Sequence, residues 1–199
     1  VIKFAISNLK SQGLLPHEAM KSKSVTRNNR QFYLKVEQVY GHYQEELARS
    51  SALDFDDILL QAVRLLKNNP QVLERVRLTW KHILVDEWQD TNLPQYELVR
   101  LLASTPQTSS VFVVGDTDQS IYGWRGADFS NVNRFQRDFN ATQVILAHNY
   151  RSTNTIVSTA QAIIEKNKDR VAKNMTSSPR AGSKIFLHEA VDDMEEAIY

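Results

Sequence analysis

The sequence predicts an α/β fold built around a parallel sheet. Three short runs, ILVDE at 83–87, VFVVGD at 111–116 and TQVILA at 142–147, are apolar and rich in β-branched residues, as buried strands are. Segments with helical spacing separate them, around 95–102 and 129–139. Because strand and helix alternate, we expect a parallel sheet with buried strands.

Before the first strand the chain is predicted to be helical with one polar break. Apolar residues recur at helical spacing over 1–9, 32–47 and 54–66, and a short helix is expected over 70–80. The stretch KSKSVTRNNR at 21–30 is basic and rich in turn-forming residues, so it should interrupt the helices.

After the third strand the pattern predicts one more helix and one more strand. Helical spacing returns over 153–164, a loop is expected over 177–183, and KIFLHEA at 184–190 has the composition of a strand that would open a second domain.

Composition excludes several classes of protein. The chain has 199 residues, 42% hydrophobic and 24% charged, which suffices for a buried core, and a net charge of +1 excludes a bulk polycation. No apolar run approaches the roughly 20 residues of a membrane span. The absence of Cys excludes disulfides and Cys-based zinc sites, and the five His residues form no HExxH pattern.

The first candidate site lies where the strand ILVDE ends. Ligands of α/β folds bind at the carboxyl ends of parallel strands, and here Asp86 and Glu87 stand at that end. ILVDEWQD is therefore typical of a Walker B strand, in which Asp86 holds Mg²⁺ and Glu87 orients or deprotonates a water. The alternative is that two carboxylates merely end a strand in solvent.

The second candidate site is the stretch VFVVGDTDQSIYGWRGAD at 111–128. A strand runs into an acid, and a polar turn carrying Gln119 leads to aromatic residues flanked by glycines. In an extended segment Tyr122 and Trp124 would face the same side, where bases could stack on them, and Arg125 could meet a phosphate or a base plane. The alternative is that both rings are ordinary half-buried aromatics.

The third candidate site is LAHNYRST at 146–153. Tyr150 and Arg151 precede the expected N-cap region of a helix at Ser152 and Thr153. A guanidinium at such a junction suits phosphate, because it is always charged and binds two oxygens at once. The alternative for Arg151 is a surface salt bridge.

In this order and spacing, the three stretches resemble the UvrD/Rep/PcrA family of superfamily I DNA helicases. ILVDEWQDTN is similar to the family's motif II, VVGDTDQSIYGWRGAD to motif III, NYRST to motif IV, and ALDFDDILL at 52–60 to a stretch upstream of motif II. The resemblance implies the RecA-like sheet of the P-loop NTPase fold. It assigns 1–80 to a helical insertion and following helices, 81–149 to the rest of the first RecA-like ATPase domain, and 150–199 to the start of a second.

The resemblance also implies ATP and Mg²⁺ as cofactors. Asp86 would coordinate Mg²⁺, Glu87 would activate water, and Gln119 would sense the γ-phosphate and couple it to DNA. Tyr150 would stack on adenine, and Arg151 would act as an arginine finger on the γ-phosphate.

The implied partners are single-stranded DNA and single/double-strand junctions, with 3′ to 5′ translocation. Tyr122, Trp124 and Arg125 would grip the single strand, and Gln89 and Asp90 would support and couple the site. The implied location is the bacterial cytoplasm or a eukaryotic nucleus or organelle, neither secreted nor in a membrane.

The sequence departs from the family pattern at several positions. The family usually has Phe or Tyr where Trp88 stands, Asp where Thr117 stands, and Gln where His148 stands. None of these changes removes a group assigned to chemistry. None of the six glycines is followed by Lys-Ser or Lys-Thr, so no GxxxxGK[ST] phosphate loop is present. We therefore expect an internal excerpt of a helicase that does not hydrolyse ATP alone. A non-catalytic helicase-like DNA-binding protein and the motor part of a helicase-nuclease are the alternatives.

Overall fold

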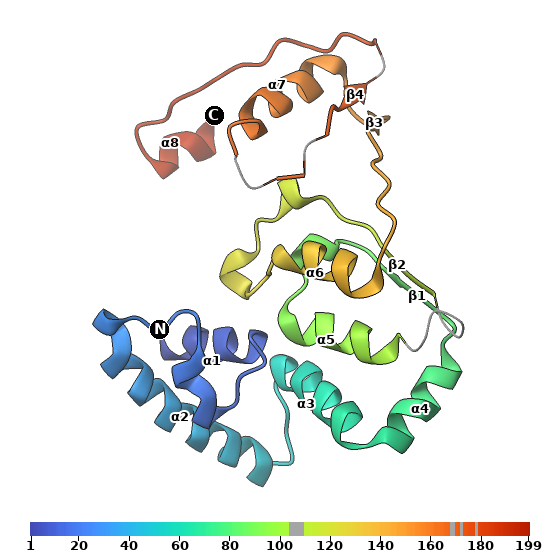
Figure 1. Cartoon of the computed structure of the whole chain (residues 1–199). Coiled ribbons are helices and arrows are strands. Elements are labelled where there is room, and N and C mark those ends of the chain that lie inside the picture. Colours follow the sequence, from blue (N-terminus) through green and yellow to red (C-terminus); the bar gives the residue numbers. More distant parts are fainter. Residues whose placement is uncertain (104–109, 168–169, 172, 178) are drawn as a thin grey trace. The chain divides into compact units, whose positions relative to one another are not determined.

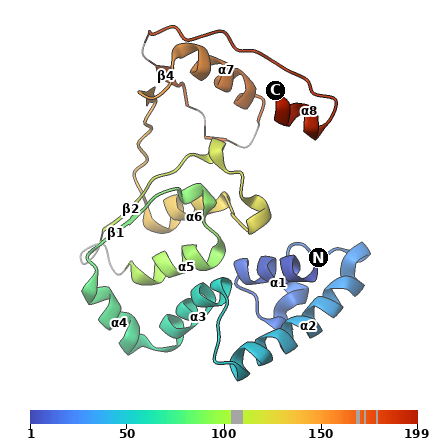
Figure 2. The same cartoon turned by 180° about the vertical axis from the view of Figure 1, so that it is seen from behind.

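The computed structural model describes residues 1–103, 110–167, 170–171, 173–177 and 179–199. The described chain divides into two compact units, an N-terminal unit, Val1–Ala141, and a C-terminal unit, Thr142–Tyr199, each of which is described by itself. Figures 1 and 2 show the chain from opposite sides.

The N-terminal unit begins with the helices that the spacing predicts. Helix α1 spans Ile2–Ser11 and α2 spans Arg30–Arg49, with the short 3-10 helices η1, Pro16–Lys21, and η2, Arg27–Asn29, between them. The predicted polar break over 21–30 is confirmed. The helices enclose a small apolar core of Ala5, Ile6, Leu9, Ala19, Tyr33, Val36 and Tyr40.

The next two helices are also confirmed. Helix α3 spans Phe55–Asn68, and its N-cap Asp54 accepts a hydrogen bond from the backbone N–H of Asp57 at 2.7 Å. Helix α4 spans Pro70–Thr79 and begins with the proline, whose missing N–H costs nothing there.

A buried lysine joins α1 to α3. The Lys10 side chain is fully buried, and its Nζ lies 2.6 Å from Asp54 Oδ2 and 2.8 Å from Asp57 Oδ2. The Tyr43 hydroxyl, from α2, donates to the same Asp54 oxygen at 2.9 Å. Burial, together with this contact, raises the pKa of Tyr43 to about 12. The acidic stretch ALDFDD thus has a structural role, that of neutralising a buried cation.

The sheet of this unit has two parallel strands, as the alternation predicts. Strand β1, His82–Val85, pairs in parallel with β2, Ser110–Val113, and helix α5, Leu93–Leu102, connects them. Helix α6, Ser130–Phe139, follows β2. Helix α5 lies between α3 and α6 in both views (Figures 1 and 2).

Only one face of these strands is covered within the described residues. A cluster of Trp88, Tyr96 and Phe135 packs beneath this face, against Val85, Val111 and Val113. On the opposite face Leu84 is 74% exposed and Phe112 is 62% exposed. The expectation of strands buried on both faces is therefore wrong for this part of the chain, because helices pack on one side alone.

In the C-terminal unit the structure confirms the helix predicted over 153–164 but not the strands predicted over 142–147 and 184–190. Helix α7 spans Asn154–Ile164, a two-residue strand β3, His148–Asn149, pairs in parallel with β4, Thr176–Ser177, and α8 spans Asp193–Ile198. The predicted loop over 177–183 includes residue 178, which lies outside the described residues, and its first residue belongs to β4.

The predicted strands at 142–147 and 184–190 are wrong. Both segments lack strand structure, and Leu146, Phe186 and Leu187 are 76%, 80% and 96% exposed. A strand needs a neighbour to satisfy its backbone hydrogen bonds, and within the described residues of the C-terminal unit only the short β3–β4 pair, with the bond from the Thr176 N–H to the Ala147 carbonyl, provides one.

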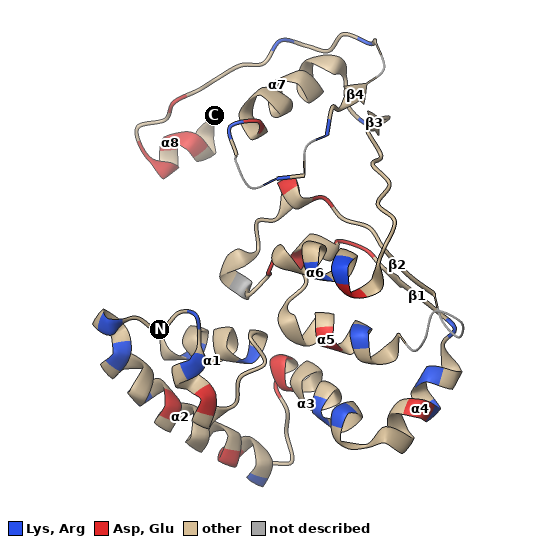
Figure 3. Ribbon diagram, in the orientation of Figure 1, with Lys and Arg blue, Asp and Glu red and all other residues tan. Residues whose placement is uncertain are grey.

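Charges of both signs occur on several helices of the N-terminal unit, whereas α8 carries only acidic residues. Lys and Arg occur together with Asp and Glu on α2, α3, α4 and α5 (Figure 3). Among the residues that the structure describes, no helix is both long and apolar enough to cross a membrane.

Candidate active site

The carboxylates Asp86 and Glu87 lie at the carboxyl end of β1, as predicted. The parallel pairing continues beyond the strands, since the Val114 N–H donates to the Val85 carbonyl and the Trp88 N–H donates to the Val114 carbonyl, both at 2.9 Å. Both carboxylates are exposed. The Glu87 N–H donates to Asp86 Oδ1 at 2.8 Å, which fixes one carboxylate against the backbone of the other.

The backbone of Glu87 is in the left-handed conformation, with φ 50° and ψ 44°. A residue with a side chain pays about 1–3 kcal/mol for such a conformation, and strained residues of this kind cluster at functional sites. The strain is held by the bond from Trp88 N and by a second bond, from the Asp90 N–H to the Glu87 carbonyl at 2.9 Å. The chain thus turns sharply where the carboxylates are presented.

A chain of hydrogen bonds connects Glu87 to Gln119. Gln89 is buried, and its Nε2 donates to Glu87 Oε2 at 2.8 Å while its Oε1 accepts from the Asp116 N–H at 2.9 Å. Asp116 Oδ2 in turn accepts from Gln119 Nε2 at 3.0 Å. The structure therefore brings together Glu87 and Gln119, which the sequence placed on separate motifs.

A rigid apolar base supports this arrangement. Trp88 is 2% exposed, and its ring lies 6.0 Å from that of Tyr96 and 5.4 Å from that of Phe135. Its indole Nε1 donates to the Asn131 carbonyl at 3.3 Å. Burial and a hydrogen bond to Asp138 raise the pKa of Tyr96, so this phenol stays protonated as a donor. Trp88, which replaces the family's usual Phe or Tyr, is thus a core residue.

The aromatic pair lies close together, but not for the predicted reason. The segment is not extended: Tyr122 has φ −100° and ψ 23° and precedes a 3-10 turn, Gly123–Arg125. The two ring centroids nevertheless lie 6.4 Å apart at an interplanar angle of 52°. Tyr122 is 38% exposed and Trp124 is 64% exposed. The Arg125 side chain lies outside the described residues, so its predicted role is not placed.

The aromatic loop rests on α1. Gly126 has φ +87°, and a Cβ there would lie 2.0 Å from Ser11 Oγ, so glycine is needed both for the turn and for the close approach. Just beyond, Asp128 pairs with Arg134 at 3.2 Å and with Lys23 at 3.7 Å. Burial opposes ionisation of Asp128, but bonds from Ser130 and these cations outweigh it and lower its pKa. The loop is held at both sides of its turn.

Tyr150 and Arg151 lie in the C-terminal unit, between β3 and α7. Tyr150 is 89% exposed, with its ring 4.3 Å from that of His148. Asn149 Oδ1 accepts from the N–H groups of Arg151 and Ser152 at 2.9 Å and 2.8 Å, which fixes the turn. Thr153 is the N-cap, as expected, but its hydroxyl makes no capping bond. Within the described residues Arg151 forms no ion pair.

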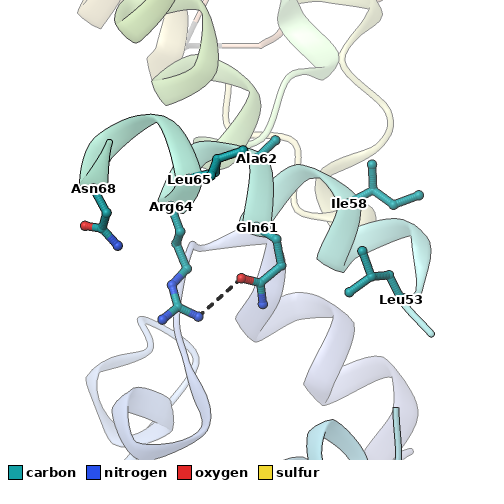
Figure 4. A pocket seen from close by; sticks show the side chains of 7 residues that line it. All are labelled: Leu53, Ile58, Gln61, Ala62, Arg64, Leu65 and Asn68. Atoms are coloured by element: carbon teal, nitrogen blue, oxygen red, sulfur yellow. Dashed lines mark hydrogen bonds between the residues drawn. The ribbon is translucent and has the colours of Figure 1, made fainter. Parts of the chain in front are cut away.

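The described residues contain no cluster of three His, Cys, Asp or Glu that would hold a metal ion by protein ligands alone. A hollow elsewhere runs along α3 and is lined by side chains unrelated to the candidate residues (Figure 4), namely Leu53, Ile58, Gln61, Ala62, Arg64, Leu65 and Asn68. Asp86 and Glu87, by contrast, are exposed at the end of β1.

Comparison with known proteins gives the family. The family model described as UvrD/REP helicase N-terminal domain matches residues 1–140, and that of the UvrD-like helicase C-terminal domain matches residues 144–199. The ATP-dependent DNA helicase PcrA of Staphylococcus aureus strain Mu50 is 43% identical over 194 residues, 97% of this chain and 26% of that protein. PcrA of Staphylococcus epidermidis strain ATCC 12228 is 41% identical over 98% of this chain and 26% of its own length. The chain thus spans about a quarter of the length of these relatives. The resemblance inferred from the three motifs is confirmed, and the chain belongs to the UvrD/REP helicase family.

Proposed function

We propose that this chain forms part of an ATP-dependent DNA helicase that couples Mg-ATP hydrolysis to 3′ to 5′ movement along single-stranded DNA and to unwinding at single/double-strand junctions. Family membership supports the proposal, as does the similarity to the Staphylococcus proteins named ATP-dependent DNA helicase PcrA. The observation that carries it is the hydrogen-bond chain from Glu87 to Gln119, which joins a strand-end carboxylate to the turn that leads into the exposed aromatic pair.

The proposed architecture is RecA-like. Residues 1–80 would form a helical insertion with the following helices, 81–149 the rest of a first RecA-like domain, and 150–199 the start of a second. The parallel β1–α5–β2 unit, with carboxylates at the strand end, is the feature that favours this arrangement.

The carboxylates suit magnesium nucleotide. Mg²⁺ is usually bound by one or two carboxylates together with phosphate oxygens and waters, so one exposed carboxylate such as Asp86 is an adequate protein ligand. The ion would neutralise charge on the phosphates. Glu87, exposed beside it with Oε2 held by Gln89, would orient and deprotonate the attacking water.

The remaining nucleotide contacts come from Gln119 in the N-terminal unit and from Tyr150 and Arg151 in the C-terminal unit. Gln119 would sense the γ-phosphate, the exposed Tyr150 ring would stack on adenine, and Arg151, without an ion pair in the described chain, would serve as an arginine finger. Such a finger is worth about 10³–10⁵ in rate in related phosphoryl transfers.

Single-stranded DNA would bind at the aromatic loop. Tyr122 and Trp124 expose neighbouring rings on which bases can stack, and Arg125 would contact the strand beside them. Since the 199 residues contain no GxxxxGK[ST] loop, the chain by itself should bind DNA but not hydrolyse ATP.

The test uses two proteins: the chain alone, and a chimaera in which it replaces the matching segment of Staphylococcus aureus PcrA. Glu87→Gln in the chimaera should lower kcat by about 10²–10⁴-fold, the usual worth of a general base, and should leave nucleotide binding intact. Glu45→Gln, an exposed change on α2, is the control. Persistent hydrolysis in the Glu87 variant would assign the base elsewhere, and DNA-stimulated hydrolysis by the chain alone would refute the predicted inactivity.

A further inference from the structure

We propose that Gln89 is a positioning residue for hydrolysis: its buried side-chain amide holds the Glu87 carboxylate and ties it to the 115–119 turn. The inference rests on the proposed function, in which Glu87 activates water. It adds a specific route by which the turn that carries Gln119 and leads to the aromatic loop is mechanically connected to that carboxylate.

The contacts of Gln89 are those that only a carboxamide makes. Its Nε2 donates to Glu87 Oε2 at 2.8 Å, with a longer bond to Asp90 Oδ2 at 3.4 Å, and its Oε1 accepts from the Asp116 N–H at 2.9 Å. One side chain thus needs a donor on one side and an acceptor on the other. Gln89 is 1% exposed, so bulk water has little access to its side-chain amide. Its backbone is held as well, because the Ser120 hydroxyl donates to the Gln89 carbonyl at 3.4 Å.

Gly115 gives independent support, because its lack of a side chain makes room for this amide. A Cβ at position 115 would lie 2.5 Å from Gln89 Oε1 and 2.9 Å from the Trp88 backbone nitrogen. Gly115 is not among the residues with positive φ, so space rather than backbone conformation accounts for glycine there. The end of β2 can therefore lie this close to the turn at 87–89 only because residue 115 has no side chain.

The geometry explains what Gln89 would do for Glu87. The left-handed backbone at Glu87 directs an exposed side chain out of the turn, and a bond to Oε2 restricts its rotation while leaving Oε1 for water. Beyond Gln89, the Asp116 side chain accepts from Gln119 Nε2 and from the Asp118 N–H. A shift of the 115–119 turn therefore moves the Asp116 N–H and, through one rigid amide, the Glu87 carboxylate.

Kinetics of the chimaera test the positioning role. Gln89→Leu removes both bonds at similar volume and should lower kcat by about 10–100-fold, the range for residues that orient a catalytic group, while KM for ATP changes less than about threefold. Gly115→Ala displaces the same amide and should give a similar loss, and the double variant should be little worse than either, since both act on one contact.

Gln89→Glu separates the two bonds. It keeps an acceptor for the Asp116 N–H but sets a carboxylate against Glu87, so kcat should fall while the stimulation of hydrolysis by DNA persists. Gln136→Glu, an exposed change on α6, is the matched control and should behave as wild type. A folded Gln89→Leu variant with kcat within about twofold of wild type would overturn the proposal.

Nuclear magnetic resonance on the chain itself tests the contact without requiring hydrolysis. The Gln89 side-chain amide protons and the Asp116 N–H should exchange slowly with solvent, and Glu87→Ala should speed exchange of the side-chain amide while leaving Asp116 protected. Fast exchange of the Gln89 amide in the wild-type chain would overturn the proposal. These readouts differ from that for the proposed function, which fails if the Glu87→Gln chimaera still hydrolyses ATP.

Discussion

Replacement of Trp124 by alanine tests the DNA-binding surface directly. The Trp124 side chain is 64% exposed and lies on a loop that is fixed on α1 through the close approach of Gly126 to Ser11. Removing an exposed side chain from such a loop should change the free energy of unfolding by no more than about 0.5 kcal/mol. The substitution should therefore act on binding and not on folding.

The size of the effect follows from stacking. One base stacked on an aromatic side chain contributes about 1–3 kcal/mol, which corresponds to a Kd about 5- to 150-fold weaker when the ring is lost. Because the Tyr122 ring lies 6.4 Å away and remains in place, we expect the variant to keep partial affinity. Fluorescence anisotropy with a labelled oligo-dT strand, at one fixed salt concentration, measures the change in the chain alone.

The chain offers a matched control in Trp80, which is 55% exposed at the C-terminal end of α4. Trp80→Ala should leave the affinity for the oligonucleotide unchanged. In the chimaera, Trp124→Ala should also reduce the stimulation of ATP hydrolysis by DNA. Unchanged affinity and stimulation for Trp124→Ala, or an equal loss in Trp80→Ala, would refute the assignment of the aromatic loop to DNA.

Two further predictions concern the buried ion pairs of the N-terminal unit. Lys10→Met leaves the fully buried Asp57 side chain without its cation, so it should lower the free energy of unfolding by about 3–5 kcal/mol, measured by urea denaturation. Adding Asp57→Asn should restore part of the lost stability. A loss below about 1 kcal/mol would show that these ion pairs do not hold α1 to α3. Burial opposes ionisation of Asp54, but bonds from Lys10, the Asp57 N–H and Tyr43 outweigh it and lower its pKa below the ordinary 3.8. A lowered folded-state pKa gives stability that is full above pH 3.8 and is lost as the pH falls through the folded-state value. Acid unfolding followed by circular dichroism should therefore begin below that pH, and Lys10→Met should show a weaker dependence over the same range.

The strands show what composition can predict and what it cannot. The runs at 83–87, 111–116 and 142–147 have the same apolar, β-branched character, yet only the first two pair. Pairing of β1 with β2 is favoured because α5 returns the chain alongside and a shared apolar cluster covers one face of both. Within the described residues of the C-terminal unit, β4 meets the 142–147 run at Ala147, and composition does not encode a neighbour.

The site residues divide in the same way. The position of Asp86 and Glu87 at the carboxyl end of β1 was predicted from sequence because a strand end in a parallel sheet is a fixed location. For Gln89 the resemblance implied a supporting and coupling role, but its hydrogen-bond partners were not predicted, since a glutamine two residues after a glutamate carries no periodic signal. The aromatic pair was found for a wrong reason, because Tyr122 and Trp124 approach through a 3-10 turn and not along an extended segment.

The sequence by itself determined helices α1 to α7, the parallel pair of β1 and β2, the three motifs and the family, because these depend on local spacing and on residue types in a fixed order; α8 was not predicted. Only the tertiary structure decided that Lys10 is a buried cation, that one sheet face is left uncovered, and that Gln89 joins Glu87 to Asp116. Those features arise where segments far apart in the chain meet within hydrogen-bond distance, and the bonds that form there depend on packing rather than on any local pattern.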